Sequence, residues 1–271
     1  MRSFFILLAI LSFCNCSSED EITVDNQDIT TGNPTESPTE SPTENPVENP
    51  VENPTDIETD SSCYPTTFTG EATYYEGIAG TSSGNCSLPV TENDYAHCAM
   101  NTIDYNNSEA CGACIQVNGA LGSVLLKVVD RCPECKTGDI DMTEEAFATI
   151  ANTIDGRVPI SWKFTTCPTT ENIAIVFKEG SSQFWTGIQL RNTKHAIANL
   201  EYQLPNGNWQ SINREIYNYF IAAEGISSPM TLRATSVLND VIILENINLV
   251  NDTVIPTNKQ FSTPEECDLN N

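Results

Sequence analysis

Short apolar runs separated by turn residues dominate the chain from about residue 63 onward. In the first half they cover 67–75, 97–100, 114–117, 123–129 and 158–164. Short runs of this kind are typical of strands, and only 143–151 carries a helix pattern. Thr143 is suited to the N-cap, and Glu144 and Glu145 favour the positive end of the helix dipole. Many short strands with few helices predict a compact β-barrel.

A second block of short apolar runs lies between about residues 172 and 254. These runs cover 173–177, 187–190, 200–203, 230–234 and 241–244. Turn residues such as 205–207 (PNG) separate them, and no helix pattern interrupts the block, which favours a β-sandwich. We therefore expect a barrel domain over 63–168, a sandwich domain over 169–255 and a tail over 256–271.

The N-terminus has the pattern of an export signal. Arg2 precedes an apolar run over 4–13, which is too short to span a bilayer as a helix. We assign 1–16 to a signal peptide and expect an extracellular protein. Cys16, with Cys14 as the competing site, would carry the lipid of a bacterial lipoprotein. The alternative is ordinary secretion, in which both cysteines are removed.

Residues 17–62 form a compositionally distinct segment. Proline recurs every fourth residue from Pro34 to Pro54, with glutamate in each spacer and almost no apolar residue. A chain of this composition buries too little apolar surface to fold. We predict a disordered, extended Pro/Thr/Glu/Asn linker that tethers the folded part.

Charge narrows the classes of partner. The formal net charge is −25, from 37 acidic and 12 basic residues. Such a surface repels nucleic acid and anionic polysaccharides at long range. A neutral polysaccharide is not repelled, so charge excludes partners here without choosing one.

The cysteines predict disulfides. An exported chain rich in cysteine is expected to oxidise them. The candidates are Cys86, Cys98, Cys111, Cys114, Cys132 and Cys135, with their connectivity left open. Two Cys-x-x-Cys pairs among them also have a spacing seen in zinc ribbons, but export favours disulfides, and we expect no metal and no cofactor.

Carboxylates follow the apolar run 123–129. Asp130 ends the run, and Asp139 and Asp141 come shortly before the helix pattern. This arrangement suggests a polar cleft on one face of the barrel. The alternative is that Asp141 caps the helix and Asp130 belongs to a turn, and composition alone favours this alternative.

Several motifs occur in an order that resembles bacterial expansins. The segments 70–75 (GEATYY), 84–87 (GNCS), 128–135 (VVDRCPEC) and 138–142 (GDIDM) resemble the first expansin domain. The segments 178–185 (KEGSSQFW), 189–192 (QLRN) and 217–220 (YNYF) resemble the cellulose-binding domain. The resemblance covers about 65–255. It implies an all-β fold, in which a six-stranded double-psi β-barrel precedes an immunoglobulin-like β-sandwich.

The resemblance also implies a site in the first domain. It brings Thr73, Asp130 and Asp141 together, and Asp141 matches the general acid of family-45 glycoside hydrolases, which share the barrel. The base of those hydrolases falls on Gly77 here. The adjacent Glu76 points to the other face of a regular strand. Inverting hydrolysis needs a second carboxylate to activate water, so a non-hydrolytic protein is expected unless a bulge turns Glu76 inward.

One position departs from the family pattern. Expansins usually carry an aromatic residue two positions after the first aspartate, and this chain has Cys132 there. The change removes a surface on which a sugar could stack.

In the second domain, the resemblance implies a polysaccharide-binding row of Trp185, Tyr217 and Phe184, with Lys178 beside it. Planar rings on a flat face suit the apolar faces of glucose. Strand alternation places Phe184 with the core residues Ile188 and Leu190, which favours Trp185 and Tyr217 as the surface residues. The remaining tryptophans, Trp162 and Trp209, are expected to pack inside.

The expected function is that of an exported, monomeric expansin-like protein. It would bind cellulose or a related β-glucan and loosen plant-type cell walls without cleaving them, with xylan and peptidoglycan as further candidate partners. Nucleic acid is excluded, and membrane contact is limited to a lipid anchor. The alternatives are a weak endoglucanase or peptidoglycan lytic transglycosylase, and a purely adhesive cellulose-binding module.

Overall fold

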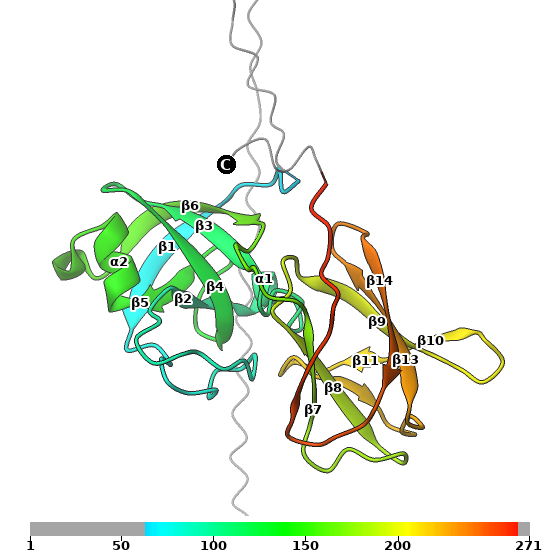
Figure 1. Cartoon of the computed structure of the whole chain (residues 1–271). Helices are drawn as coiled ribbons and strands as arrows, with labels where there is room; N and C mark the ends of the chain where they lie inside the picture. Colours follow the sequence, from blue (N-terminus) through cyan, green and yellow to red (C-terminus); the bar gives the residue numbers. More distant parts are fainter. Residues whose placement is uncertain (1–62, 265–271) are drawn as a thin grey trace, which may run out of the picture. The chain divides into compact units, whose positions relative to one another are not determined.

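The computed structural model describes residues 63–264 (Figure 1). The predicted signal peptide, Cys14, Cys16 and the proline-rich linker lie outside the described residues. Within the described range, no helix is both long and apolar enough to cross a membrane.

The first domain is a closed six-stranded barrel. Its strands are β1 (Phe68–Tyr75), β2 (His97–Asn101), β3 (Cys114–Asn118), β4 (Ser123–Cys132), β5 (Ile140–Thr143) and β6 (Val158–Thr165). They close in the order β1-β5-β2-β4-β3-β6. The pairs β1–β5 and β2–β4 are parallel and the other pairs are antiparallel. The predicted barrel is confirmed. Among its strands, only β5 was missed from the sequence, because this strand has four residues.

Helices lie at the strand ends of the barrel (Figure 1). The helices are α1 (Thr102–Tyr105), α2 (Glu144–Ile150) and the short 3-10 helix η1 (Thr153–Asp155). The Thr143 side chain accepts a hydrogen bond from the backbone N–H of Ala146, which confirms the predicted N-cap. The Trp162 ring is fully buried, as predicted, and stacks on Phe68 with the ring centroids 4.2 Å apart.

The second domain is a two-sheet sandwich. Its strands are β7 (Ala174–Phe177), β8 (Thr186–Arg191), β9 (Ile197–Gln203), β10 (Trp209–Ser211), β11 (Asn213–Arg214), β12 (Phe220–Ala222), β13 (Met230–Ser236), β14 (Val241–Ile247) and β15 (Val254–Pro256). One sheet has the order β10-β9-β13-β14 and the other β11-β12-β8-β7-β15. Burial alternates along β13, as expected for a strand with one face in the core. Phe261 also packs in this core, so the packed chain runs beyond the predicted domain end at residue 255.

The structure contains disulfides between Cys86 and Cys111, Cys114 and Cys167, and Cys132 and Cys135. Cys63 is also disulfide-bonded. The two Cys-x-x-Cys motifs therefore do not act together, and no cluster of three or more candidate metal ligands occurs within 63–264.

Cys98 corrects the disulfide prediction, because it is buried and free. It lies on β2 inside the barrel core, where its neighbours on the adjacent strands are Val128 and Met142. Neither neighbour carries a thiol, since valine has no sulfur and the thioether of methionine forms no disulfide. The strand neighbours of Cys98 therefore explain why it is free, and the spacing of cysteines in the sequence does not reveal these neighbours.

Candidate functional site

The barrel closure brings three of the predicted site residues into one row across four adjacent strands. Thr73 of β1 is the partner of Asp141 on β5, and Ala99 of β2 is the partner of both Asp141 and Asp130 on β4. Directly paired residues share a face of a sheet, and strands lie roughly 4.8 Å apart, so the two aspartate Cα atoms are separated by about 10 Å. The small Ala99 lies between them. We call Thr73, Asp130 and Asp141 the aspartate face.

Asp141 is half-buried and bound to its neighbour on β1. The Thr73 hydroxyl donates a hydrogen bond of 2.6 Å to Oδ1 of Asp141. Burial raises the pKa of Asp141 above its ordinary value, although the Thr73 hydrogen bond acts to lower it. Asp141 therefore keeps its proton to a higher pH than an ordinary carboxyl group. Such a group can donate a hydrogen bond or a proton to an oxygen of a ligand.

Asp130 is held by the backbone. Its Oδ1 accepts a hydrogen bond of 2.6 Å from the N–H of Asn85 and one of 2.8 Å from the N–H of Arg131. Two backbone donors on one oxygen fix the direction of the carboxylate, so Asp130 presents a positioned negative charge beside Asp141.

A further carboxylate, not singled out by the sequence, acts on this face. Among charged groups, Glu134 raises the pKa of Asp141 most, ahead of the smaller upward effect of Asp130, while Arg157 lowers it. Glu134 is exposed and lies in the loop closed by the Cys132–Cys135 disulfide. Glu76 is also exposed and follows the last residue of β1. The sequence signal for Glu134 was its place inside the 128–135 motif.

Tyr75 is a second residue that sequence reasoning missed. It lies two residues after Thr73 on β1, which places both on one strand face. Its hydroxyl is buried and has no hydrogen-bond partner within the described part of the chain. Burial raises the pKa of Tyr75, and Cys98, Asp130 and Asp141 add to this effect. Because side chains alternate along a strand, the position of Tyr75 two residues after Thr73 was the sequence signal that could have identified Tyr75.

The family aromatic position in this region is occupied by a buried disulfide sulfur. Cys132 is 5% exposed and bonded to Cys135. The bond keeps the 132–135 loop tight at the end of β4, which is the loop that carries Glu134.

The predicted polysaccharide-binding residues of the sandwich lie around the start of β8. Trp185, Tyr217 and Lys178 are partly exposed, and Phe184 is 75% exposed. The Lys178 Nζ atom lies 5.9 Å from the ring centroid of Tyr217 and 5.3 Å from that of Tyr219. We call Lys178, Phe184, Trp185 and Tyr217 the aromatic platform.

The exposure of Phe184 corrects the alternation argument. A turn closed by the bridge between Ser182 and Trp185 contains Phe184, and β8 begins only at Thr186. Alternation holds within a strand and does not extend into the preceding turn. Phe184 is therefore the most exposed aromatic of the platform and is not a core residue.

The same sheet face is covered farther along β8. Gln189 shares a strand face with Gly187, beside which the Trp185 ring lies, and it is fully buried. Its Nε2 donates hydrogen bonds of 3.1 Å to the carbonyl of Cys86 in the barrel and 3.3 Å to that of Asn218. One end of this face is thus open at Trp185, and the other contacts the barrel.

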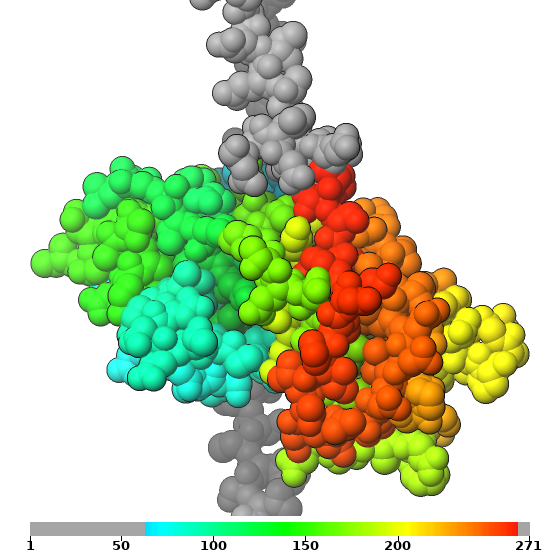
Figure 2. All heavy atoms as spheres, viewed as in Figure 1, coloured from blue at the N-terminus to red at the C-terminus, as the bar shows by residue number. Residues whose placement is uncertain are grey.

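Trp209 is not a core residue, contrary to the sequence expectation. It lies on the edge strand β10, partly exposed, and the Arg233 guanidinium lies 4.5 Å from its ring centroid. Arg233 is itself fixed by Glu201 through hydrogen bonds of 2.6 and 2.7 Å. In Figure 2 the hairpin tip between β9 and β10 (yellow) projects from the sandwich, away from the core.

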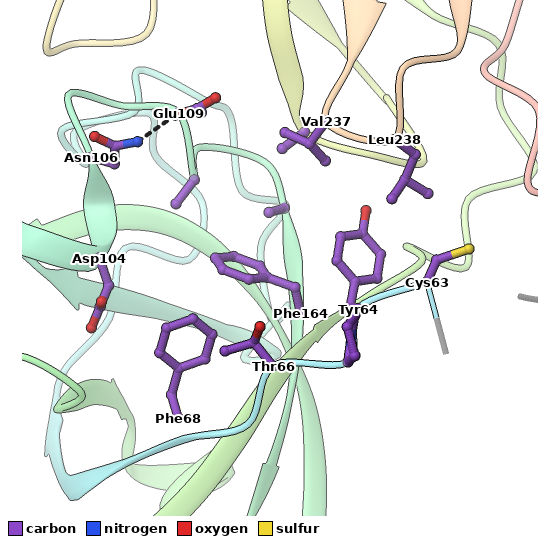
Figure 3. Close-up of a pocket in the computed structure, with 14 residues that line it drawn as sticks. Cys63, Tyr64, Thr66, Phe68, Asp104, Asn106, Glu109, Phe164, Val237 and Leu238 are labelled. Carbon is purple, nitrogen blue, oxygen red and sulfur yellow. Dashed lines mark hydrogen bonds between the residues drawn. The ribbon is translucent and has the colours of Figure 1, made fainter. Parts of the chain in front are cut away.

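A separate apolar hollow of about 340 Å³ lies away from the aspartate face. Figure 3 shows the rings of Tyr64 and Phe164 near Val237 and Leu238, with Phe68 farther along the wall. It includes none of the predicted site residues.

Comparison with known proteins places the chain among expansins. It is 31% identical over 186 residues to Expansin-YoaJ of Bacillus subtilis, covering 67% of this chain and 79% of that protein. It is 24% identical over 204 residues to Expansin-like protein 1 of Dictyostelium discoideum, covering 70% of each. No family model matches the chain.

Solved structures agree with the sequence comparison. A crystal structure of a variant Clavibacter michiganensis expansin in complex with cellohexaose matches with a TM-score of 0.68 at 30% identity. It covers 73% of this chain and 100% of that one, and the apo structure of the Clavibacter michiganensis expansin matches equally well.

Proposed function

The chain belongs to the expansin family, and from that premise we propose that it binds cellulose or a related β-glucan and loosens plant-type cell walls without cleaving them. The observation that carries this proposal is the row formed by Thr73, Asp141, Ala99 and Asp130 across four strands. The aromatic platform supplies the complementary surface for sugar rings.

The proposed action is competition for hydrogen bonds between glucan chains. Asp141, whose pKa is raised by burial, donates to a glucan oxygen, and Asp130 accepts from a glucan hydroxyl. The rings of Trp185, Phe184 and Tyr217 stack on the apolar faces of glucose and displace water. Together these contacts replace those between neighbouring glucan chains, so the chains separate without bond cleavage.

The surroundings of Gly77 support a non-hydrolytic protein. An inverting hydrolase needs a base roughly 6.5–9.5 Å from its acid. At Gly77, which has a φ of +74°, a Cβ atom would lie 2.8 Å from His97 Nε2 and 2.8 Å from Thr143 Cγ2. The position therefore has no room for a basic carboxylate.

We also propose the setting in which the protein acts. Export followed by lipid attachment at Cys16 or Cys14, or by free secretion, would place a monomer outside the cell. Xylan and peptidoglycan are further candidate ligands, since each presents sugar rings to the same surfaces.

The second candidate is a glycan-cleaving enzyme, either a weak endoglucanase or a peptidoglycan lytic transglycosylase. The observation that favours it is the raised pKa of Asp141, since a protonated carboxyl group can act as a general acid. Glu134 is the carboxylate to test as its partner.

The deciding experiment combines three assays on one preparation: adsorption to cellulose, release of reducing sugar, and extension of a clamped cell-wall strip. We expect adsorption and extension without sugar release. Release of reducing sugar or of anhydromuropeptides would favour the enzyme. Adsorption without extension would leave a purely adhesive module.

A further inference from the structure

One side chain connects the aspartate face to the aromatic platform. Asn85 lies between β1 and β2, and its backbone N–H donates to Oδ1 of Asp130 at 2.6 Å. Its side-chain Nδ2 donates to the carbonyl oxygen of Ile216 at 2.8 Å. Ile216 directly precedes Tyr217. A single residue therefore binds an aspartate of the barrel and the backbone beside a platform aromatic.

The segment around Asn85 is held against the end of β4. A Cβ atom on Gly84 would lie 2.5 Å from the carbonyl oxygen of Val129, so only glycine allows this approach. The N–H of Cys86 donates to the same carbonyl at 3.1 Å, and Cys86 is disulfide-bonded to Cys111. Asn85 is thus anchored on both sides to the strand that carries Asp130.

Further hydrogen bonds with buried side chains surround the exposed contact between Asn85 and Ile216. The carbonyl of Cys86 accepts from the side-chain amides of Gln189 at 3.1 Å and Asn218 at 3.2 Å. Both donors are buried. Tyr105, also fully buried, donates to the carbonyl of Ile216 at 2.7 Å and accepts from Asn85 Nδ2 at 2.8 Å. Buried networks of this kind rigidify the parts that they join.

We propose that Asn85 is a positioning residue that holds the aromatic platform in fixed register with the aspartate face, so that one glucan chain engages both. The proposal rests on the proposed function. A rigid connection makes the second contact intramolecular and raises its effective concentration. If the connection through Asn85 is loosened, the aspartate face and the aromatic platform each still bind glucan. The extra affinity that comes from binding both at once is then lower.

The chemistry of the contact explains why an amide is needed. Asn85 Nδ2 faces two oxygens, the carbonyl of Ile216 and the hydroxyl of Tyr105. In Asn85→Asp, a carboxylate would face the Ile216 carbonyl without a proton to donate. In Asn85→Ala, the bond is lost, while the backbone N–H that binds Asp130 remains.

The test is the dependence of affinity on ligand length. Calorimetry with soluble cello-oligosaccharides of increasing length would be run on the wild type, Asn85→Ala and Asn85→Asp. Asn199→Ala is the control, because Asn199 is a β9 residue whose Nδ2 contacts only the nearby Ser211 hydroxyl at 3.4 Å among the described residues. We expect all proteins to bind the shortest ligands equally. The gain in affinity with length should fall about tenfold or more in both Asn85 variants and persist in the control.

A second readout measures the connection without any ligand. Spin labels on cysteines introduced at Ile154 of the barrel, 93% exposed, and Val254 of the sandwich, 55% exposed, report the distance between the two domains. Asn85→Ala should broaden this distribution while Asn199→Ala leaves it narrow. If the distance distribution broadens in Asn85→Ala but the wild type binds no glucan, the proposed function is overturned and the connection between the domains is supported. An unchanged distribution, an unchanged length gain, or an equal loss for short and long ligands would each overturn the role of Asn85.

Discussion

Thr73 donates a 2.6 Å hydrogen bond to Asp141 from a strand that runs parallel to that of the aspartate. Two opposed effects therefore meet on one carboxyl group. Burial favours its neutral form, and the hydroxyl favours its charged form. The pKa of Asp141 is set by their balance.

Replacing Thr73 with Val should raise the pKa of Asp141 further. The substitution keeps the shape of the side chain and removes the donor that favours the carboxylate. Carboxyl carbon chemical shifts followed through a pH titration would measure the change. Thr149→Val, whose hydroxyl contacts the Glu145 carbonyl on α2, is a control that should leave Asp141 unchanged. A lower or unaltered pKa of Asp141 in Thr73→Val would contradict the balance described here.

Asp141→Asn should abolish wall extension while cellulose adsorption persists. Asparagine replaces the acidic O–H donor of Asp141 with the weaker N–H donor of an amide and never carries charge, while the aromatic platform is untouched. Extension and adsorption measured on one preparation would check this. Glu134→Gln distinguishes the two candidate functions, because it should leave extension largely intact in a non-hydrolytic protein. If extension survives in Asp141→Asn, the aspartate face is not the working surface.

Trp185→Ala should weaken adsorption to cellulose. Truncation of a stacking aromatic at a binding surface costs about 2 kcal/mol, or roughly thirtyfold in affinity. Binding isotherms on insoluble cellulose would measure it. Trp209→Ala is the matched control, because Trp209 packs on Arg233 within the β10-β9-β13-β14 sheet, whereas the platform lies at the start of β8 in the other sheet. This variant should bind as the wild type does. Equal losses in both variants would argue against the platform.

Tyr75→Phe should stabilise the protein by about 1 kcal/mol. The substitution removes a buried hydroxyl that has no hydrogen-bond partner among residues 63–264, and such a group costs about 1–3 kcal/mol. Urea unfolding at neutral pH would measure the change in the free energy of unfolding. Tyr105→Phe is the opposite case, because that hydroxyl donates to Ile216, and it should destabilise. A destabilised Tyr75→Phe would reveal a partner for the phenol.

His97 should make stability fall in mild acid. The buried ring accepts a hydrogen bond of 3.0 Å from the N–H of Ile78 at Nε2, and its Nδ1 lies 2.9 Å from the carbonyl oxygen of Asp94. This pairing requires the neutral ring with its proton on Nδ1. Burial lowers the pKa of His97 below its ordinary value, although Asp94, Asp130 and Glu145 act to raise it. Since the unfolded chain binds the proton more readily, this contribution is present above about pH 6.5 and is lost as the pH falls toward the lowered pKa.

The measurement is the free energy of unfolding across this range. The slope contributed by His97 should not exceed about 1.4 kcal/mol per pH unit. His97→Gln should reduce the slope, because glutamine does not titrate. An undiminished slope in that variant would assign the acid sensitivity to other groups.

The sequence predicted the fold class well because short apolar runs and turn residues mark most of the longer strands. It missed β5, β10, β11, β12 and β15, which are all four residues or shorter, since a run of that length carries too little pattern. The motif order supplied Thr73, Asp130 and Asp141, and the pairing of β1 with β5 explains how Thr73 contacts Asp141 from 68 residues away.

The errors in the site have physical causes that a sequence does not expose. Phe184 precedes its strand, so alternation did not apply to it. Cys98 faces Val128 and Met142 on neighbouring strands, so its thiol stays free despite seven bonded cysteines elsewhere in the described chain. Alternation from Thr73 and the 128–135 motif were the local signals for Tyr75 and Glu134, but the effect of each residue on the site depends on its three-dimensional neighbours.

Parallel pairing of β1 with β5 has a kinetic consequence for this protein. The hydroxyl and the carboxylate that it joins are 68 residues apart in the chain, so forming their contact closes a long loop. Long-range closures of this kind are slow steps in folding. Refolding followed by an early probe, such as far-ultraviolet circular dichroism, should therefore run ahead of recovered activity, and a chain truncated before β5 should never acquire it.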